Sequence, residues 1–325
     1  MRSARLLFSG LAAAAAFQAP QRRGRRASTT LSALPPQTTL QRKDGLASLS
    51  FYASVGHVTS WVCQGEEQLF LSEKATFVPG KSAIRGGIPI CWPAFNDRHL
   101  PAGKHGIVRT SDKWTAEAFD GEDPFVVLNH PTVYFDVSET KEISGYHFDE
   151  PAGVSVPADL SLKVTLFPSS LRIDMTVVNL GESDFRFSTV LHNYFSVNAM
   201  PVTVKGFQGL SGLKDGLPFT DPAENVIVEG QTETQRLYAT SKAISWETSA
   251  AKGGLKKLTM TKSENLPDVV LWNVGAENAA SMSDLHTGGD QRYVCVEAGI
   301  CASPDAVVPA GGTWSGWQDV AVTTA

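Results

Sequence analysis

The segment ADLSLKVTLFPSSLRIDMTVVNL, residues 158–180, decides the fold class of this chain. In its second half, apolar side chains alternate with polar ones, which is the period of a strand that buries one face. The buried face is expected to carry Leu171, Ile173, Met175 and Val177. Residues 158–168 form an apolar run directly before it, so the two runs predict an antiparallel hairpin.

Short runs of this kind continue along the chain, separated by Gly, Pro and Asn turns. We expect strands in residues 50–63, 67–72, 123–137, 185–197, 202–210, 236–247, 255–263, 268–274, 292–300 and 313–323. The run at 123–137 is expected to hold two strands, broken at Asn129-His130-Pro131. No segment keeps a helical period beyond a turn or two. The sequence therefore predicts an all-β protein, a large antiparallel β-sandwich.

Residues 44–325 are expected to form one domain, because no linker, low-complexity stretch or internal repeat divides them. The chain has 325 residues, of which 42% are hydrophobic and 19% charged, a composition typical of a globular protein with a sizeable core. No apolar run approaches the roughly 20 residues of a membrane span.

Residues 1–43 differ in composition from the rest of the chain. They contain no acidic residue and eight Lys and Arg, among Ser, Thr, Ala and Pro. We expect a bipartite targeting presequence, with a signal of about residues 1–16 and a disordered transit segment of about residues 17–43. Phe17, directly after small residues, resembles the junction found in algae with complex plastids and predicts the plastid stroma. The alternative is a secretory signal followed by a basic spacer.

Without residues 1–43 the chain is strongly acidic. It keeps 20 Lys and Arg against 33 Asp and Glu, a net charge of −13. Such a chain is a poor candidate to bind nucleic acid or an anionic membrane, and an anionic ligand would need a local cationic pocket. We expect the mature protein to be a monomer.

The four cysteines form no CxxC pair and have no zinc-like spacing with histidine. They are Cys63, Cys91, Cys295 and Cys301. We expect buried free thiols, as in a reducing compartment, with a regulatory Cys295–Cys301 disulfide as the alternative. No metal-ligand cluster or dinucleotide motif stands out in the sequence.

Residues 82–114, SAIRGGIPICWPAFNDRHLPAGKHGIVRTSDKW, combine cationic and large apolar side chains with paired glycines and three prolines. Gly and Pro disfavour both helix and strand, yet the apolar side chains require burial. A buried, irregular, cationic segment predicts the wall of a ligand site. The alternative is a structural connection whose arginines pair with surface carboxylates.

Two polar side chains lie within predicted strands. In FRFSTVLHNYFSV, residues 185–197, alternation places His192 with polar and aromatic neighbours, opposite the phenylalanine face. In RYVCVEAGI, residues 292–300, Glu297 interrupts an apolar run, and burying a carboxylate is costly unless it is paired or functional. One His and one Glu facing a common pocket would form an acid/base pair that works near neutral pH. The alternatives are a structural histidine and an ion-paired glutamate.

Taken together and in order, five motifs resemble the glucose-6-phosphate 1-epimerase family, hexose-6-phosphate mutarotases within the aldose 1-epimerase superfamily. The motifs are IRGGIPICWPAF, HGIVRTSDKW, LHNYF, DVVLWN and VCVEAG. The resemblance covers residues 45–323 and implies a mutarotase-like β-sandwich. It also implies an isomerase that interconverts the α and β anomers of hexose 6-phosphates, with glucose 6-phosphate as the first candidate. Such a reaction is expected to need neither a metal nor a redox cofactor, which matches the absence of a metal-ligand cluster or dinucleotide motif.

The same resemblance assigns roles to individual residues. The catalytic histidine and glutamate of the family fall on His192 and Glu297. Its RGG and HGxxR arginines fall on Arg85 and Arg109, which would bind substrate and phosphate, and His105 would line the sugar pocket. In the implied mechanism Glu297 starts ionised and takes the C1 hydroxyl proton, while His192 starts protonated and donates to the ring oxygen.

Two positions depart from the family pattern. Lys104 stands where Gln is common, and would either contact the phosphate or be solvated. Gln235, in ETQRLY, stands where the family has Asp, so recognition of a sugar hydroxyl there would lack a charge. Four aromatic side chains are expected either to stack on the sugar or to pack in the core, namely Trp92, Phe95, Trp114 and Trp272.

Two other functions stay open at this point. A mutarotase for unphosphorylated aldoses would use His192 and Glu297 without requiring Arg85 and Arg109. A sugar-binding sandwich that has lost catalysis would be consistent with Gln235.

Overall fold

The computed structural model describes residues 34–96, 104–136, 155–250 and 253–324. Strands dominate this part of the chain, and the pairs that build its sheets are antiparallel. The predicted all-β, antiparallel class is therefore confirmed. Among the described residues, no helix is long and apolar enough to cross a membrane.

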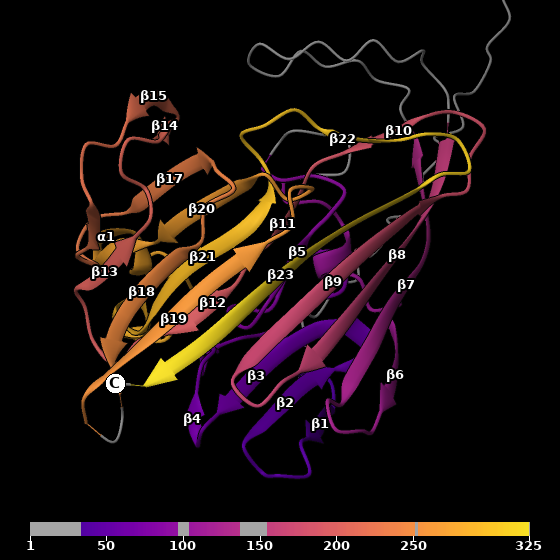
Figure 1. Cartoon of the computed structure of the whole chain (residues 1–325). Helices are drawn as coiled ribbons and strands as arrows, with labels where there is room; N and C mark the ends of the chain where they lie inside the picture. Colours follow the sequence, from indigo (N-terminus) through magenta and orange to yellow (C-terminus); the bar gives the residue numbers. More distant parts are fainter. Residues whose placement is uncertain (1–33, 97–103, 137–154, 251–252, 325) are drawn as a thin grey trace, which may run out of the picture. The chain divides into compact units, whose positions relative to one another are not determined.

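One layer of the sandwich is a long sheet that Figure 1 shows with β23 crossing between β19 and β9. The described part of this sheet has nine strands. In spatial order they are β16 (Asn225–Val228), β13 (Val202–Lys205), β18 (Ile244–Ser249), β19 (Leu255–Lys262), β23 (Thr313–Thr324), β9 (Ser170–Asn179), β8 (Ser155–Leu166), β7 (Phe125–Asp136) and β6 (Thr115–Phe119).

The second layer is a sheet of eight strands within the described residues. Its strands are β15 (Leu217–Thr220), β14 (Ser211–Lys214), β17 (Thr234–Ala239), β20 (Asp268–Asn273), β21 (Tyr293–Ile300), β11 (Thr189–Leu191) and β5 (Ile90–Cys91), with β12 (Tyr194–Ser196) also paired to β21. Alternate residues of β20 and β21 share one hydrophobic cluster with alternate residues of β9, β19 and β23. The main core therefore lies between the two sheets, and the other face of the second sheet is left for a site.

A smaller sheet at the beginning of the chain contributes to the same hydrophobic cluster. Its strands are β1 (Gln37–Gln41), β2 (Ala47–Tyr52), β3 (His57–Cys63) and β4 (Glu66–Glu67). A two-stranded ribbon joins β10 (Phe185–Phe187) to β22 (Ala306–Val308). The short helical elements are η1 (Ala53–Val55), η2 (Val108–Thr110), α1 (Gly275–Ala279) and η3 (Gly289–Arg292).

The hairpin that predicted the fold is present as β8 and β9. Their register pairs Leu166 with Leu171, and every second residue of β9 is buried. Leu171, Ile173 and Met175 lie in the main core together with Val177, as the alternation predicted.

Other predicted strands differ from the observed ones. Residues 123–137 were expected to hold two strands, but β7 is continuous, because a bulge between His130 and Val133 absorbs the proline without ending the pairing with β8. The run at 185–197 is divided into β10, β11 and β12. Strands β14, β15 and β16 were missed because their exposed residues weaken the apolar alternation.

The sandwich begins before residue 44. β1 pairs along its whole length with β2. Arg42 is 6% exposed, and its guanidinium forms ion pairs with Asp44 and Asp123. Residues 37–43, expected to be the disordered end of a presequence, therefore contribute a strand and a buried cation to the fold. The rest of that predicted presequence, through residue 33, lies outside the described residues.

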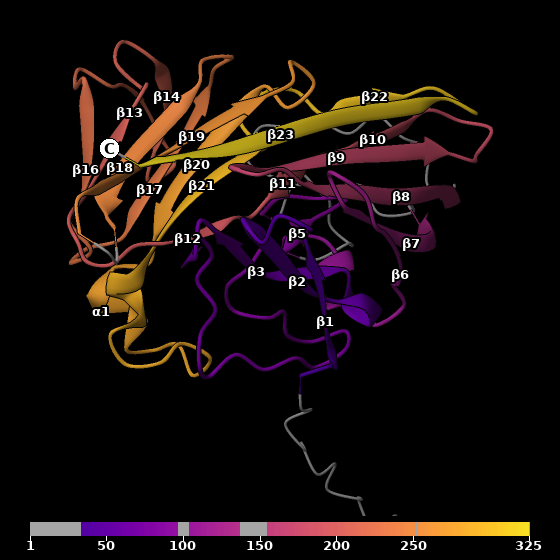
Figure 2. The ribbon, with the colours of Figure 1, turned by 60° about the horizontal axis from the view of Figure 1, so that its bottom comes forward.

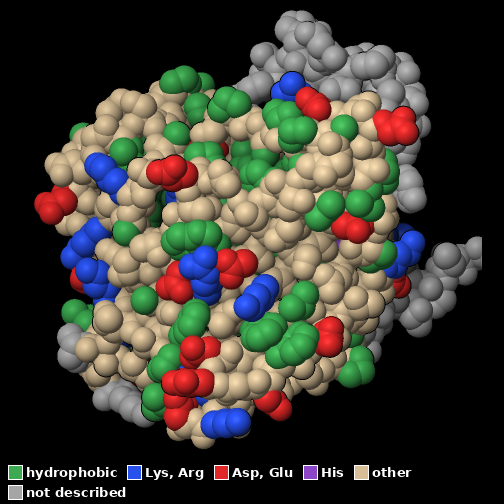
Figure 3. Space-filling model, turned by 45° about the vertical axis from the view of Figure 1, so that its right-hand side comes forward, with side chains coloured by type: hydrophobic (Ala, Val, Ile, Leu, Met, Phe, Trp, Pro, Cys, Tyr) green, Lys and Arg blue, Asp and Glu red, His purple; other side chains and the backbone are tan. Residues whose placement is uncertain are grey.

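The face of the molecule in Figure 3 carries acidic and basic side chains in alternation rather than in a patch of one sign. A phosphate site requires locally concentrated positive charge, which this alternation does not provide. The cationic residues Arg85, His105 and Arg109 instead lie near His192, on the face of the second sheet opposite the main core.

Candidate functional site

A break between two strands positions His192. β11 ends at Leu191 and β12 begins at Tyr194, and both pair with β21. The backbone N–H of His192 donates to the carbonyl of Pro89 at 2.9 Å, and that of Tyr194 donates to Gly87 at 3.0 Å. Leu191 packs in the main core, whereas the rings of His192 and Tyr194 stack on the opposite face, with centroids 4.8 Å apart. His192 thus faces away from the main core, as predicted.

Glu297 lies in the middle of β21, which is buried on both faces. Its neighbours Val296 and Ala298 point into the main core, so the Glu297 side chain points toward His192. His192 Nδ1 and Glu297 Oε1 are 3.3 Å apart, and the two side chains are 12% and 1% exposed. The structure therefore brings together the two groups that the sequence suggested as an acid/base pair.

The surroundings of this pair favour its uncharged forms. Burial lowers the pKa of His192 well below its ordinary value, and the nearby His105, Arg85 and Arg109 lower it further. Burial raises the pKa of Glu297 well above its ordinary value. These shifts oppose the charged pair from which the implied mechanism starts, so a protonated His192 beside an ionised Glu297 requires a compensating interaction.

The glycines of the RGG motif let the chain pass close to its neighbours. A Cβ atom on Gly86 would lie 2.3 Å from the carbonyl oxygen of Phe70, and one on Gly87 would lie 2.2 Å from that of Val58. Both glycines have positive φ, which disfavours any other residue. This close packing fixes the backbone that presents Arg85.

Arg85 is held beside the acid/base pair by two side chains. Its Nε donates to Asp284 Oδ2 at 3.2 Å, and its Nη1 donates to the Tyr194 hydroxyl at 3.0 Å. Asp284 belongs to the loop after α1, which Figure 2 shows beside the segment that follows β3. Because Tyr194 also stacks on His192, Arg85 and His192 share one positioning side chain.

The second cationic motif also lies beside His192, because the ring centroids of His105 and His192 are 6.0 Å apart. His105 has a left-handed backbone, with φ of 63°, and its Nδ1 accepts a hydrogen bond from the N–H of Asn96 at 3.2 Å. Burial, then Arg109, Lys104 and Arg85, lower the pKa of His105 to about 3. A neutral ring whose Nδ1 is an acceptor carries its proton on Nε2, so His105 can donate a hydrogen bond to a ligand.

The side chain of Arg109 contacts the backbone of Lys104. Arg109 Nη2 donates to the carbonyl of Lys104 at 3.1 Å, which leaves further guanidinium N–H groups for a ligand. Lys104 is exposed. The positive charge of Arg109 is among the causes that lower the pKa of His192, so Arg109 lies near the acid/base pair.

Gln235 lies in a row of side chains that crosses the second sheet. It is directly opposite Trp272, which is opposite Cys295, which in turn is opposite Tyr194. The half-buried Trp272 ring is nearly perpendicular to the His192 ring, with centroids 5.7 Å apart. Trp272 is thus placed to contact a ligand, and Gln235 lies one strand farther away.

The other three aromatic candidates are buried. Trp92 is 0% exposed, Trp114 4% and Phe95 5%. Trp92 and Trp114 belong to the main core, so they pack in the core and do not stack on a sugar. Phe95 packs beside His105, with ring centroids 5.1 Å apart.

Sequence reasoning missed several polar side chains around the site. Asn193 is fully buried, and its Nδ2 donates to the carbonyl of Val296 and to Gln318 Oε1, both at 2.9 Å. Gln318 Nε2 donates back to Asn193 Oδ1 at 2.8 Å. The LHNYF motif contains Asn193, but Gln318 and Asp284 lie where no local pattern marks them.

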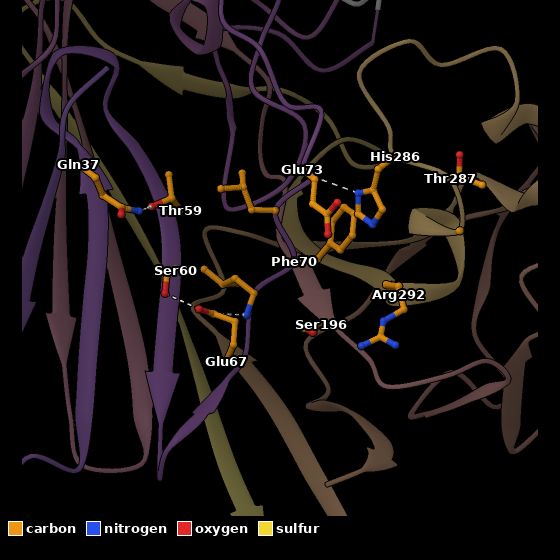
Figure 4. Close-up of a pocket in the computed structure, with 13 residues that line it drawn as sticks. Gln37, Thr59, Ser60, Glu67, Phe70, Glu73, Ser196, His286, Thr287 and Arg292 are labelled. Atoms are coloured by element: carbon orange, nitrogen blue, oxygen red, sulfur yellow. Dashed lines mark hydrogen bonds between the residues drawn. The ribbon is translucent and has the colours of Figure 1, made fainter. Parts of the chain in front are cut away.

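A separate hollow of about 650 Å³ lies beyond Phe70 and is lined by neither member of the acid/base pair. Figure 4 shows Phe70 beside His286, and the backbone N–H of Glu73 donates to His286 Nδ1 at 3.2 Å. The Phe70 ring stacks on both His286 and Tyr194, so it separates this hollow from the site around His192.

The chain matches the family model described as aldose 1-epimerase over residues 37–321. A Cenchrus ciliaris protein with the provisional name glucose-6-phosphate 1-epimerase is 31% identical over 279 residues, covering 82% of this chain and 78% of that protein. An Escherichia coli (strain K12) protein with the same provisional name is 29% identical over 268 residues, covering 79% of this chain and 81% of that protein.

The fold also matches that of a solved relative. The crystal structure of YeaD from Salmonella typhimurium, provisionally described as a mutarotase, aligns with a TM-score of 0.69 and 21% identity, covering 89% of this chain and 90% of that one. The match of the family model to nearly the whole described part of the chain identifies this protein as a member of the aldose 1-epimerase family.

Proposed function

We propose that this protein interconverts the α and β anomers of hexose 6-phosphates, with glucose 6-phosphate as the first candidate. One observation carries the proposal: His192 lies 3.3 Å from the buried Glu297, and two arginines act on the same histidine. The provisional name shared by the two sequence relatives supports the phosphorylated substrate.

The reaction opens and recloses the sugar ring. Glu297 takes the proton of the C1 hydroxyl while His192 gives a proton to the ring oxygen, and the bond between C1 and that oxygen breaks to leave an aldehyde. After rotation about the C1–C2 bond, the hydroxyl formed from the ring oxygen attacks the other face of the aldehyde, and both proton transfers run in reverse. Positioned proton transfer of this kind typically contributes about 10²–10⁴-fold in rate.

The phosphate group has two roles in this proposal. Arg85 and Arg109 bind its oxygens and orient the ring, since guanidinium groups match phosphate geometry. The same arginines depress the pKa of His192, so a bound phosphate that neutralises them favours movement of the shared proton from Glu297 to His192. The site then holds the charged pair that the reaction requires.

The test compares anomer exchange of glucose 6-phosphate and of glucose by NMR magnetisation exchange. We expect a much higher kcat/KM for the phosphorylated sugar, and equal efficiency would rule out the phosphate assignment. Arg85→Ala should raise KM for glucose 6-phosphate far more than for glucose. Arg172→Ala is the matched control, because Arg172 pairs with Asp174 on β9.

We also propose that the residues before β1 direct the protein to a plastid. The acid-free, Arg-rich composition of that region supports this, as does Phe17 after its run of small residues. Fusion of residues 1–36 to a fluorescent protein in an alga with complex plastids tests it. Retention of the fusion in the secretory pathway would contradict it.

A further inference from the structure

The acid/base pair has a third potential metal ligand beside it. Cys295 lies two residues before Glu297 on β21, so both side chains are on the same face of the strand. A ring nitrogen of His192, the Cys295 sulfur and a carboxylate oxygen of Glu297 lie within 4.8 Å of one another. Cys295 is a free thiol and is 0% exposed.

Two polar atoms of this cluster lack a hydrogen-bond partner within the described part of the chain. They are Glu297 Oε2 and His192 Nδ1, whose 3.3 Å contact with Glu297 Oε1 is an ion-pair contact without hydrogen-bond geometry, and both atoms are buried. Buried polar atoms without a partner are costly and are uncommon in folded proteins. A cation that accepts lone pairs from these two atoms would therefore relieve the cost of burying them without partners.

The donor set selects a class of ion. Zinc binds nitrogen, sulfur and carboxylate oxygen at about 2.0–2.3 Å in a tetrahedron, which places ligand atoms roughly 3.3–3.8 Å apart. The contact of 3.3 Å between His192 and Glu297 already has this spacing, and the Cys295 sulfur lies within 4.8 Å of a ligand atom of each. Magnesium and calcium prefer all-oxygen sites and match this set poorly.

We propose that His192, Cys295 and Glu297 form a binding site for a thiophilic divalent cation, such as zinc or cadmium, that reversibly inhibits the enzyme. The ion is an inhibitor and not a cofactor, because it occupies both the proposed acid and the proposed base. On binding, Cys295 and Glu297 release their protons to solvent, and the fourth coordination position is left for water. The inhibition rests on the proposed function, whereas metal binding does not.

Binding is tested on the full chain with cobalt as a spectroscopic probe. After treatment with a chelator, addition of cobalt should produce a thiolate-to-cobalt charge-transfer band that saturates at one ion per chain and is removed by zinc. Cys295→Ser and Cys295→Ala should both abolish the band. Cys63→Ser should retain it, because Cys63 is a buried cysteine of β3 outside this cluster.

Inhibition is tested by anomer exchange of glucose 6-phosphate. Zinc should slow exchange, EDTA should restore it, and magnesium should have no effect. Relative to the uninhibited rate of each variant, loss of the sulfur ligand in Cys295→Ser should raise the inhibitory zinc concentration at least about tenfold. Unchanged zinc sensitivity, or the absence of a saturable cobalt band, would overturn the site. A cobalt band in a protein without exchange activity would support the metal site and reject the proposed function.

Discussion

At the scale of single residues, the acid/base pair works with one proton between two groups. Burial disfavours both the imidazolium of His192 and the carboxylate of Glu297, and positive charge from Arg85 and Arg109 acts on the histidine. Because the two groups are 3.3 Å apart, their titrations are coupled, and the apparent pKa values belong to the pair. The pH dependence of activity reports this arrangement.

We predict a bell-shaped pH profile of kcat/KM for glucose 6-phosphate. The acid limb reflects binding of a second proton to the pair. Its midpoint lies below the ordinary histidine pKa of 6.5, because burial lowers the pKa of His192. The alkaline limb reflects loss of the last proton from the pair. Its midpoint lies above the ordinary glutamate pKa of 4.5, because burial raises the pKa of Glu297. Arg85→Ala removes a positive charge that lowers the pKa of His192, so its acid limb should move to higher pH.

The control for this shift is Arg172→Ala, which removes a distant arginine. Its acid limb should coincide with that of the unmodified protein. An acid limb that stays in place or moves to lower pH in Arg85→Ala would contradict the proposed action of Arg85 on His192.

We further predict that Glu297→Gln and His192→Ala each lower kcat by about 10²–10⁴-fold, since each removes one proton-transfer group. NMR magnetisation exchange measures the loss. Glu247→Gln is the matched control for the amide replacement, because Glu247 pairs with Lys205 on neighbouring strands. Exchange at the unmodified rate in either site variant would exclude this mechanism.

At the scale of structural elements, the break between β11 and β12 is held in place by a hydrogen-bonded contact with the nine-stranded sheet. The reciprocal amide hydrogen bonds of Asn193 and Gln318 join the residue after His192 to β23. Asn193 also donates to the carbonyl of Val296, the residue before Glu297. One buried side chain thus connects the backbones that carry both members of the pair, which makes Asn193 a positioning residue.

We predict that Gln318→Met lowers kcat while leaving KM nearly unchanged. The substitution leaves the buried amide of Asn193 without its partner, which should also lower the free energy of unfolding by about 1–3 kcal/mol. Steady-state exchange kinetics and urea denaturation measure the two effects. Gln208→Met, at an exposed position, should change neither. A rise in KM with normal kcat would mean that this amide pair serves binding instead.

Sequence reasoning succeeded for elements in which one face is buried. The β8–β9 hairpin, β19, β20, β21 and β23 were predicted because their apolar residues alternate or form compact runs. It failed for β14, β15 and β16, where exposed residues weaken the pattern. The division of 185–197 was also missed, because a strand break is set by the partners of the backbone and not by the side-chain period.

At the scale of the whole molecule, the start of the sandwich determines which residues a mature chain must keep. Leu40 of β1 is 6% exposed and belongs to the main core. Arg42 donates to the carbonyl of Leu166, at the end of β8. The first strand therefore connects the small sheet to the large one.

We predict that a chain beginning at Leu34 is as stable as the full chain, whereas one beginning at Asp44 is less stable. Burial of a leucine such as Leu40 contributes about 1.5–3 kcal/mol, and loss of β1 also exposes an edge of β2. Urea denaturation followed by tryptophan fluorescence compares the chains. Equal midpoints for the two truncated chains would show that β1 is dispensable.

The antiparallel class, and the placement of strands that bury one face, are readable from the sequence alone, because alternation of apolar and polar residues is a local property of the chain. The motifs, which are equally local, mark His192, Glu297, Arg85 and Arg109 as site residues. Their roles as acid, base and phosphate ligands stay predictions.

Tertiary structure alone decided which distant side chains meet. It brought His192 into contact with Glu297, placed Cys295 beside both, and joined Arg85 to Asp284. These contacts depend on strand register and on the packing of loops from distant parts of the chain, for which no local period exists. The shifts in the pKa values of the pair likewise come from burial, which only the assembled sheets provide.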